Sequence, residues 1–185
     1  RERIQEMSVL NVAVVCGSLQ QPSRTLVLCE ALLAKIGEFR TMVPHRVEIA
    51  SFGRRMGACY WRSELPEDIE AHLLAVEKAD LLIAASPVHN ATFSGLFKHF
   101  LDFTAMDSLA GKPTLLAATG GSALHGLVID QQLRPLLAMK QALTLPIGVF
   151  ATEADFISHE ICSLALEKRI ELAVQLALPF IPGAD

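Results

Sequence analysis

The chain has 185 residues, 51% apolar and 19% charged, so it is long enough to bury one full core and too apolar to be intrinsically disordered. Its 16 basic and 20 acidic residues give a net charge of −4 without a basic cluster, which disfavours nucleic acid as a partner. Apolar runs such as Val12–Cys16 and Leu81–Ala85 are far shorter than the roughly 18 residues that span a bilayer, so we expect no membrane partner either.

The cysteines give no sign of a metal site. Four cysteines and six histidines show neither a Cys-x-x-Cys motif nor a zinc spacing. Cys16 and Cys29 fall in an apolar strand and on an apolar helix face, where a cysteine is usually a small core residue. Together with a charged first segment unlike a signal peptide, this predicts a reduced, cytoplasmic protein.

Short apolar runs alternate with longer amphipathic segments along the whole chain. In chain order we expect a strand over Val9–Cys16, a helix over Ser23–Phe39, a strand over Arg46–Ala50, a long loop over Ser51–Leu65, a helix over Pro66–Lys78, a strand over Asp80–Ser86, a helix over Phe93–Thr104, a strand over Pro113–Ala118, a helix over Ser122–Leu143, a strand over Leu145–Ala151 and a helix over His159–Leu178. Five strands, each followed by a helix, predict an α/β three-layer sandwich with a parallel sheet. No linker or repeat divides the chain, so we expect a single domain over 9–178 with terminal extensions at 1–8 and 179–185.

Three loops stand at the carboxyl ends of the first, third and fourth strands, the edge at which open parallel sheets bind ligands. These loops are Gly17–Thr25, Ser86–Gly95 and Thr119–Ser122.

The first loop suits a phosphate monoester. It leads into a helix N-terminus, where free N–H groups and the helix dipole favour an anion. Ser18, Ser23 and Thr25 add hydroxyl groups, and Gln20 adds an amide. The loop matches neither common nucleotide-binding fingerprint, and Ser23 has an alternative interpretation as a simple N-cap.

The other two loops suit a flat ring. Pro87 fixes the backbone just past a strand, before His89 and Asn90, and Gly120–Gly121 offers bare backbone. Each loop alone is also compatible with an ordinary turn. His125, on the helix that follows, is either a surface or subunit-contact residue or an acid–base group. A site for phosphate and ring without a nucleophile, metal or acid–base pair points to cofactor chemistry.

At these loops the chain resembles the flavodoxin-like NAD(P)H-dependent FMN reductases. Within them it is most similar to the reductases that supply reduced FMN to bacterial alkanesulfonate and methanesulfonate monooxygenases. The resemblance runs from Val9 to Leu178 and is most specific over 16–25, 86–102, 118–122 and 130–135. It implies a flavodoxin-like five-stranded parallel sheet in the order 2-1-3-4-5.

Carried over by position, the resemblance places the FMN phosphate and ring on the three loops. The residues that it implies for FMN binding are Ser18, Gln20, Ser23, Thr25, Pro87, Val88, His89, Asn90, Thr119, Gly120 and Gly121. The chain departs from the family at Gln20, where an arginine is common, and at His89, where a tyrosine is common. The two-component members also carry a π-bulge, which we expect within His125–Gln132, at an interface beside the flavin.

The resemblance implies hydride transfer from NADH or NADPH to FMN by ring stacking, with no catalytic side chain. Reduced FMN would then pass to a flavin-dependent monooxygenase in sulfonate desulfonation, for sulfur acquisition. We also expect a homodimer or homotetramer, in which Ser51–Leu65 or His125 of a neighbouring subunit covers the nicotinamide. The alternatives are an FMN-retaining quinone or azo-dye reductase and a flavodoxin-type electron carrier. Arg54, Arg55 and Arg62 are either solvated or available to a 2′-phosphate of NADPH.

Overall fold

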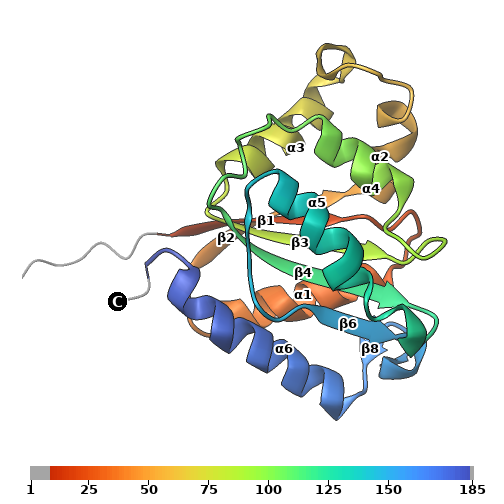
Figure 1. Ribbon diagram of the computed structural model, residues 1–185, viewed down its shortest axis with the longest axis vertical. Helices are drawn as coiled ribbons and strands as arrows, with labels where there is room; N and C mark the ends of the chain where they lie inside the picture. The colour runs from red at the N-terminus through yellow and green to blue at the C-terminus, as the bar shows by residue number, and fades with distance from the viewer. Residues whose placement is uncertain (1–8, 184–185) are drawn as a thin grey trace, which may run out of the picture.

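The computed structural model describes residues 9–183 as a parallel sheet between two layers of helices (Figure 1). The sheet strands are β1 (Leu10–Cys16), β2 (Met42–Glu48), β3 (Leu81–Pro87), β4 (Pro113–Gly120), β5 (Leu143–Thr144) and β6 (Val149–Thr152). The α-helices are α1 (Arg24–Gly37), α2 (Ile49–Met56), α3 (Glu67–Lys78), α4 (Gly95–Asp102), α5 (Arg134–Met139) and α6 (Leu164–Ala177). The expected extension 1–8 and residues 184–185 lie outside the described residues.

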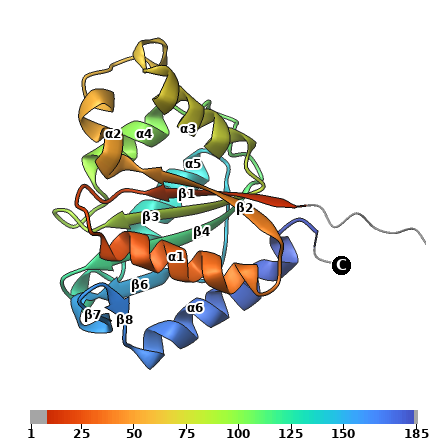
Figure 2. The same ribbon diagram turned by 180° about the vertical axis from the view of Figure 1, so that it is seen from behind.

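The sheet has the order β2-β1-β3-β4-β5, with β6 also paired to β4, and each of these pairs is parallel. The predicted flavodoxin-like α/β sandwich is therefore confirmed. α1 and α6 cover one face, best seen in Figure 2, and α2 to α5 cover the other.

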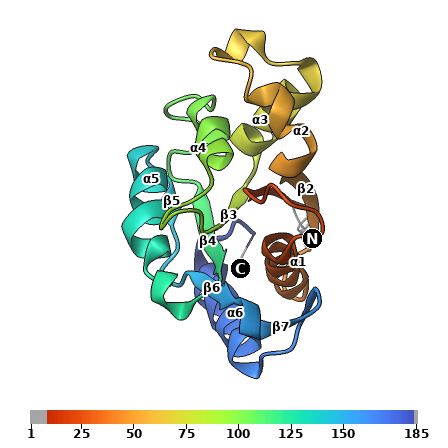
Figure 3. The same ribbon diagram turned by 90° about the vertical axis from the view of Figure 1, so that its right-hand side faces the viewer.

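The two faces of the sheet explain why its central strands are apolar throughout. On β1, Ala13 and Val15 pack with the helices of one layer, and Val12 and Val14 pack with those of the other. Side chains alternate along a strand, so a strand covered on both faces is buried at consecutive positions. Figure 3 shows the edge at which these strands end, with the connecting loops gathered there.

The region after the second strand was predicted incorrectly. The strand is Met42–Glu48 rather than Arg46–Ala50, because as an edge strand it leaves residues such as Val43 exposed and loses the apolar pattern. The expected loop Ser51–Leu65 begins instead inside α2, which buries Phe52 and Met56. Gly53 hides this helix in the sequence, and it packs closely on α4, since a Cβ there would lie 2.8 Å from Leu96 Cδ1.

The last strand and last helix also differ from the prediction. Instead of one strand over Leu145–Ala151, the chain forms two short strands, β5 before this range and β6 at its end. In the gap between the two strands, the Leu145 and Pro146 carbonyls accept hydrogen bonds from Arg134, at 2.9 and 3.4 Å. A hairpin of β7 (Phe156–Ile157) and β8 (Glu160–Ile161) then precedes α6, so the helix does not begin at His159. Its N-cap is Ser163, which accepts from the Leu166 amide at 3.2 Å.

The expected helix Ser122–Leu143 is broken into three parts. A 3₁₀ turn (Ala123–His125) comes first, then a π-helical turn (Ile129–Leu133), then α5. The Arg134 amide donates to the Ile129 carbonyl, the five-residue spacing that defines a π-helix. The π-bulge expected within His125–Gln132 is therefore confirmed, displaced by one residue at its C-terminal end.

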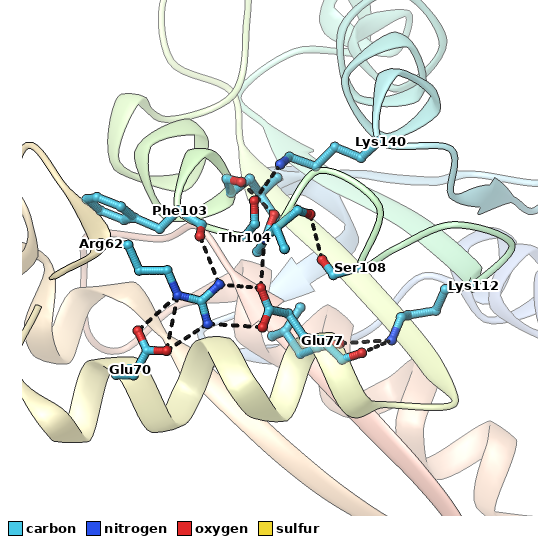
Figure 4. Close-up of polar contacts among 11 residues, drawn as sticks. Arg62, Glu70, Glu77, Phe103, Thr104, Ser108, Lys112 and Lys140 are labelled. Carbon is cyan, nitrogen blue, oxygen red and sulfur yellow. Dashed lines mark hydrogen bonds and ion pairs between the residues drawn. The ribbon is translucent and has the colours of Figure 1, made fainter.

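Arg62 ties the turn before α3 to α3 itself and to the end of α4 (Figure 4). Its guanidinium donates to Glu70 at 2.7 Å, to Glu77 at 2.6 Å and to the Phe103 carbonyl at 3.3 Å. Burial by itself acts to raise the pKa of the Glu77 carboxylate. Hydrogen bonds from Arg62 and from the Ala105 amide, together with the nearby positive charges, outweigh this effect, so the pKa lies below its usual value.

Two lysines hold backbone carbonyls in the same region (Figure 4). The Lys112 ammonium donates to the carbonyls of Val76, Glu77 and Ala79, at 2.6–3.0 Å, and so satisfies the C-terminal end of α3. Lys140 donates to the Thr104 carbonyl at 3.1 Å. Burial lowers the pKa of both lysines. Arg62 and these lysines are thus committed to stabilising the fold.

We expect Arg62→Met to lower the free energy of unfolding by about 2 kcal/mol at neutral pH, because it leaves the 13% exposed Glu77 side chain without its partner. The pKa of Glu77 is depressed in the folded state, so its stabilisation is present above the ordinary value of 4.5 and is lost as the pH falls through the lower folded value. The difference in the free energy of unfolding between the variant and the wild type should therefore become smaller at acidic pH. Urea denaturation at several pH values measures this difference.

The matched control is Arg55→Met, which removes an exposed ion pair to Asp68. A loss for Arg62→Met no larger than that of the control would contradict the structural role given to Arg62.

Candidate active site

A cavity of about 370 Å³ opens at the carboxyl ends of the strands, within the size range of small-molecule sites. The residues predicted for FMN binding line it, except Asn90; those present are Ser18, Gln20, Ser23, Thr25, Pro87, Val88, His89, Thr119, Gly120 and Gly121. Three loops far apart in the sequence therefore meet at one site. Their contact with FMN stays a prediction.

Two predicted residues lie elsewhere. Asn90 is exposed at the tip of its loop, with a φ of 46°, in a tight turn closed by paired hydrogen bonds between His89 and Thr92. His125 is exposed at the end of the 3₁₀ turn that follows the Gly-Gly loop. Neither lines the cavity.

The first loop is held by its own hydroxyl groups. Ser23 caps α1, accepting from the Leu26 amide at 3.2 Å, which confirms the N-cap interpretation. Ser18 Oγ accepts from the Gln20 amide at 3.2 Å and lies 3.1 Å from its carbonyl. These contacts fix the loop at the N-terminus of α1, where the helix dipole favours a negative charge.

Two buried hydroxyl contacts join the loops to one another. Thr25 Oγ1 and Thr119 Oγ1 lie 2.7 Å apart, which links the start of α1 to the end of β4. Ser94, only 1% exposed, donates from Oγ to the Gly17 carbonyl at 2.6 Å and from its amide to Ser86 Oγ at 2.9 Å. The positions of the three loops are therefore mutually dependent.

Glycines set the distances between these loops. A Cβ on Gly17 would lie 2.8 Å from Phe97 Cβ, and one on Gly120 would lie 2.9 Å from Phe150 Cζ, so both sites are closed to side chains. A Cβ on Gly121 would meet nothing within 4 Å. The cavity thus has open space against bare backbone at Gly121, next to Pro87–His89, which fits a flat ring.

A fourth segment completes the cavity and was missed in the sequence. Thr152, Glu153, Phe156 and His159 come from the end of β6 and the β7–β8 hairpin. Two-residue strands carry too little periodicity to be recognised. The available signal was the pair Thr152 and Asp155, in which the Asp155 carboxylate accepts from the Thr152 amide at 2.7 Å, as in a capping box.

The charges at the cavity are few. Arg24 and Glu153 both line it and form an ion pair of 2.9 Å. Of the three arginines expected either to be solvated or to serve a 2′-phosphate, Arg55 and Arg62 are paired with carboxylates of α3 and Arg54 is exposed. None of the three lines the cavity. In residues 9–183 no group of three or more His, Cys, Asp or Glu side chains is arranged to hold a metal, and no helix there is long and apolar enough to cross a membrane.

Comparison with known proteins assigns the family. The model of the NADPH-dependent FMN reductase family matches residues 10–156. The chain belongs to this family. The enzyme class expected from the sequence, an oxidoreductase that reduces FMN with a nicotinamide nucleotide, is thereby confirmed.

Individual relatives agree with this assignment. The chain is 50% identical to the NADH-dependent FMN reductase SfnE of Pseudomonas putida, covering 92% of this chain and 91% of the relative. It is 44% identical to an FMN reductase (NADPH) of Pseudomonas aeruginosa, covering 95% of each. Among solved structures, the apo NADH:FMN oxidoreductase EmoB superposes with a TM-score of 0.82 at 26% identity, covering 92% of this chain and 90% of that one. An oxidoreductase from Corynebacterium diphtheriae gives 0.79 at 32% identity, covering 94% and 98%.

We expect Ser94→Ala to lower the free energy of unfolding by about 2 kcal/mol, because it removes the α4 cap and leaves the Gly17 carbonyl without its donor. Ser108→Ala removes a comparable local bond to the Ala105 carbonyl away from the cavity, and should cost less than about 0.5 kcal/mol. Urea denaturation of both variants tests this, and equal losses would contradict the linking role of Ser94.

Proposed function

We propose that this cavity binds FMN, with the phosphate at the N-terminus of α1 and the isoalloxazine ring between Pro87–His89 and Thr119–Gly121. The observation that carries the proposal is the convergence of the predicted residues of three separate loops on one cavity. The lining of the cavity matches FMN. Hydroxyl groups lie at the N-terminus of α1, where the phosphate would bind, and bare backbone lies where the ring would bind.

When bound, FMN supplies the hydride-accepting chemistry. The role of the chain is to orient the flavin and to exclude water from it. Pro87 and Val88 form one wall, and the Val88 amide donates to the Thr119 carbonyl at 2.8 Å, which sets its distance from the Gly120–Gly121 wall. With the flavin held between these two walls, direct hydride transfer to it would need no side chain as acid or base. His89 and the glycines are accordingly positioning residues.

We infer that the physiological donor is NADH. The support is the 50% identical relative, which is named as NADH-dependent.

We propose that the product, reduced FMN, leaves for a flavin-dependent monooxygenase that desulfonates sulfonates for sulfur acquisition. The resemblance of the loops to sulfonate-system reductases supports this.

We expect the enzyme in the cytoplasm, as a single domain over 9–178. It is a homodimer or homotetramer, for which exposed Leu124, Leu127 and Met139 flanking the π-helical turn provide apolar contact surface.

The experiment is the rate of NADH or NADPH oxidation by dialysed protein, with and without added FMN. The proposal predicts a rate that requires free FMN, saturates with it, and has a higher kcat/KM for NADH. Activity with quinone or azo dye alone, by protein that stays yellow on dialysis, would favour a flavin-retaining reductase. Bound FMN without activity from either donor would leave an electron carrier.

The ring position has its own test in Gly121→Val. A side chain at Gly121 meets no protein atom within 4 Å of its Cβ, so the fold should be preserved while the ring's space is filled. We expect FMN to bind at least about tenfold more weakly, by flavin fluorescence quenching, with unchanged thermal stability.

The matched control is Gly95→Val, because a Cβ at Gly95 also meets nothing within 4 Å and Gly95 does not line the cavity. Unchanged FMN affinity in Gly121→Val would place the ring elsewhere.

A further inference from the structure

An ion pair joins Arg24 and Glu153, two residues that line the cavity that we assign to FMN. Arg24 is the first residue of α1, and Glu153 lies in the 3₁₀ turn after β6, 129 positions along the chain. Arg24 Nη1 donates to Glu153 Oε1 at 2.9 Å, and the two side chains are 40% and 66% exposed. An ion pair this exposed is weak, so either partner is available for exchange.

These two residues dominate the charge around the proposed phosphate. Among the described residues that line the cavity, Arg24 is the only Lys or Arg and Glu153 is the only carboxylate. The hydroxyl groups of Ser18, Ser23 and Thr25 carry no charge, and Gln20 is neutral. A phosphate monoester brings a charge of about −1.5 to −2 at pH 7. Its fixed counter-charge here must come from Arg24.

Arg24 can neutralise and bind the phosphate only in part while it is paired with Glu153. The guanidinium presents five N–H donors in a planar fork suited to phosphate. Glu153 engages Nη1, and Nε is buried without a hydrogen-bond partner in the described part of the chain. Without the ion pair to Glu153, the Arg24 guanidinium could turn fully to the phosphate. The Glu153 carboxylate would then no longer add a second negative charge beside the phosphate.

We propose that Glu153 competes with the FMN phosphate for Arg24, and that this competition keeps FMN a dissociable substrate. The inference rests on the proposed function, since it requires FMN in this cavity. FMN entry transfers Arg24 from the carboxylate to the phosphate, and departure returns it. Glu153 thus sets the affinity for the phosphate and the rate at which reduced FMN is released.

The test uses Glu153→Gln and Arg24→Gln in the full chain, with FMN and riboflavin as ligands. Riboflavin has the same ring but no phosphate. Flavin fluorescence quenching gives Kd, and stopped-flow displacement gives the dissociation rate. We expect Glu153→Gln to bind FMN about tenfold more tightly and release it more slowly, and Arg24→Gln to bind it about tenfold more weakly. Neither substitution should change the Kd of riboflavin.

The matched control is Asp68→Asn, which removes one negative charge from the exposed ion pair with Arg55, outside the cavity. It should leave the affinity for FMN unchanged. The competition is contradicted if Glu153→Gln leaves FMN affinity unchanged or weakens it, if FMN and riboflavin shift equally, or if Asp68→Asn has the same effect. A wild-type protein that fails to bind FMN would refute the proposed function itself, which is a separate result.

Discussion

Ser94, buried at the N-terminus of α4, links the loop after β1 to the end of β3. It caps α4 while donating to the Gly17 carbonyl at 2.6 Å, and the Ser94 amide donates to Ser86 Oγ. Thr25 and Thr119 make the equivalent link across to β4 at 2.7 Å. Parallel strands place their carboxyl ends at one edge of the sheet, and such contacts fix the loops there to one another. The cavity depends on them, because its walls are loops, strand ends and the start of α1, which must be held in place together.

A cavity built in this way is suited to positioning a cofactor. Its walls are hydroxyl groups, backbone and apolar surface, with one guanidinium and one carboxylate that neutralise each other. Membership of an FMN reductase family agrees with the proposal that this cavity would orient the flavin without a catalytic acid or base. The charges around Arg62 and Glu77, drawn in Figure 4, stabilise the fold. Neither residue lines the cavity.

The features of the fold that depend on the local apolar pattern and on loop composition could be predicted from the sequence. Buried strands such as Leu81–Pro87 are apolar on both faces, and the loop compositions pointed to the correct edge. Prediction from the sequence failed where neighbouring elements override local preference. Gly53 looks like a helix breaker until α4 is seen packed against it, and Arg134 supports a gap in the last strand by binding its carbonyls. The hairpin that brings Phe156 and His159 to the cavity has strands of two residues, too short for any period to appear.

Hydrogen–deuterium exchange with and without FMN tests the central claim most directly, that four separate segments form one FMN site. The account predicts slower exchange on FMN addition in residues 17–25, 87–92, 119–122 and 152–159 together, with no change in residues 57–66. A second, shallower cavity lies beside Arg62 and Leu74. Protection confined to that region, or absent from residues 119–122, would contradict the site described here.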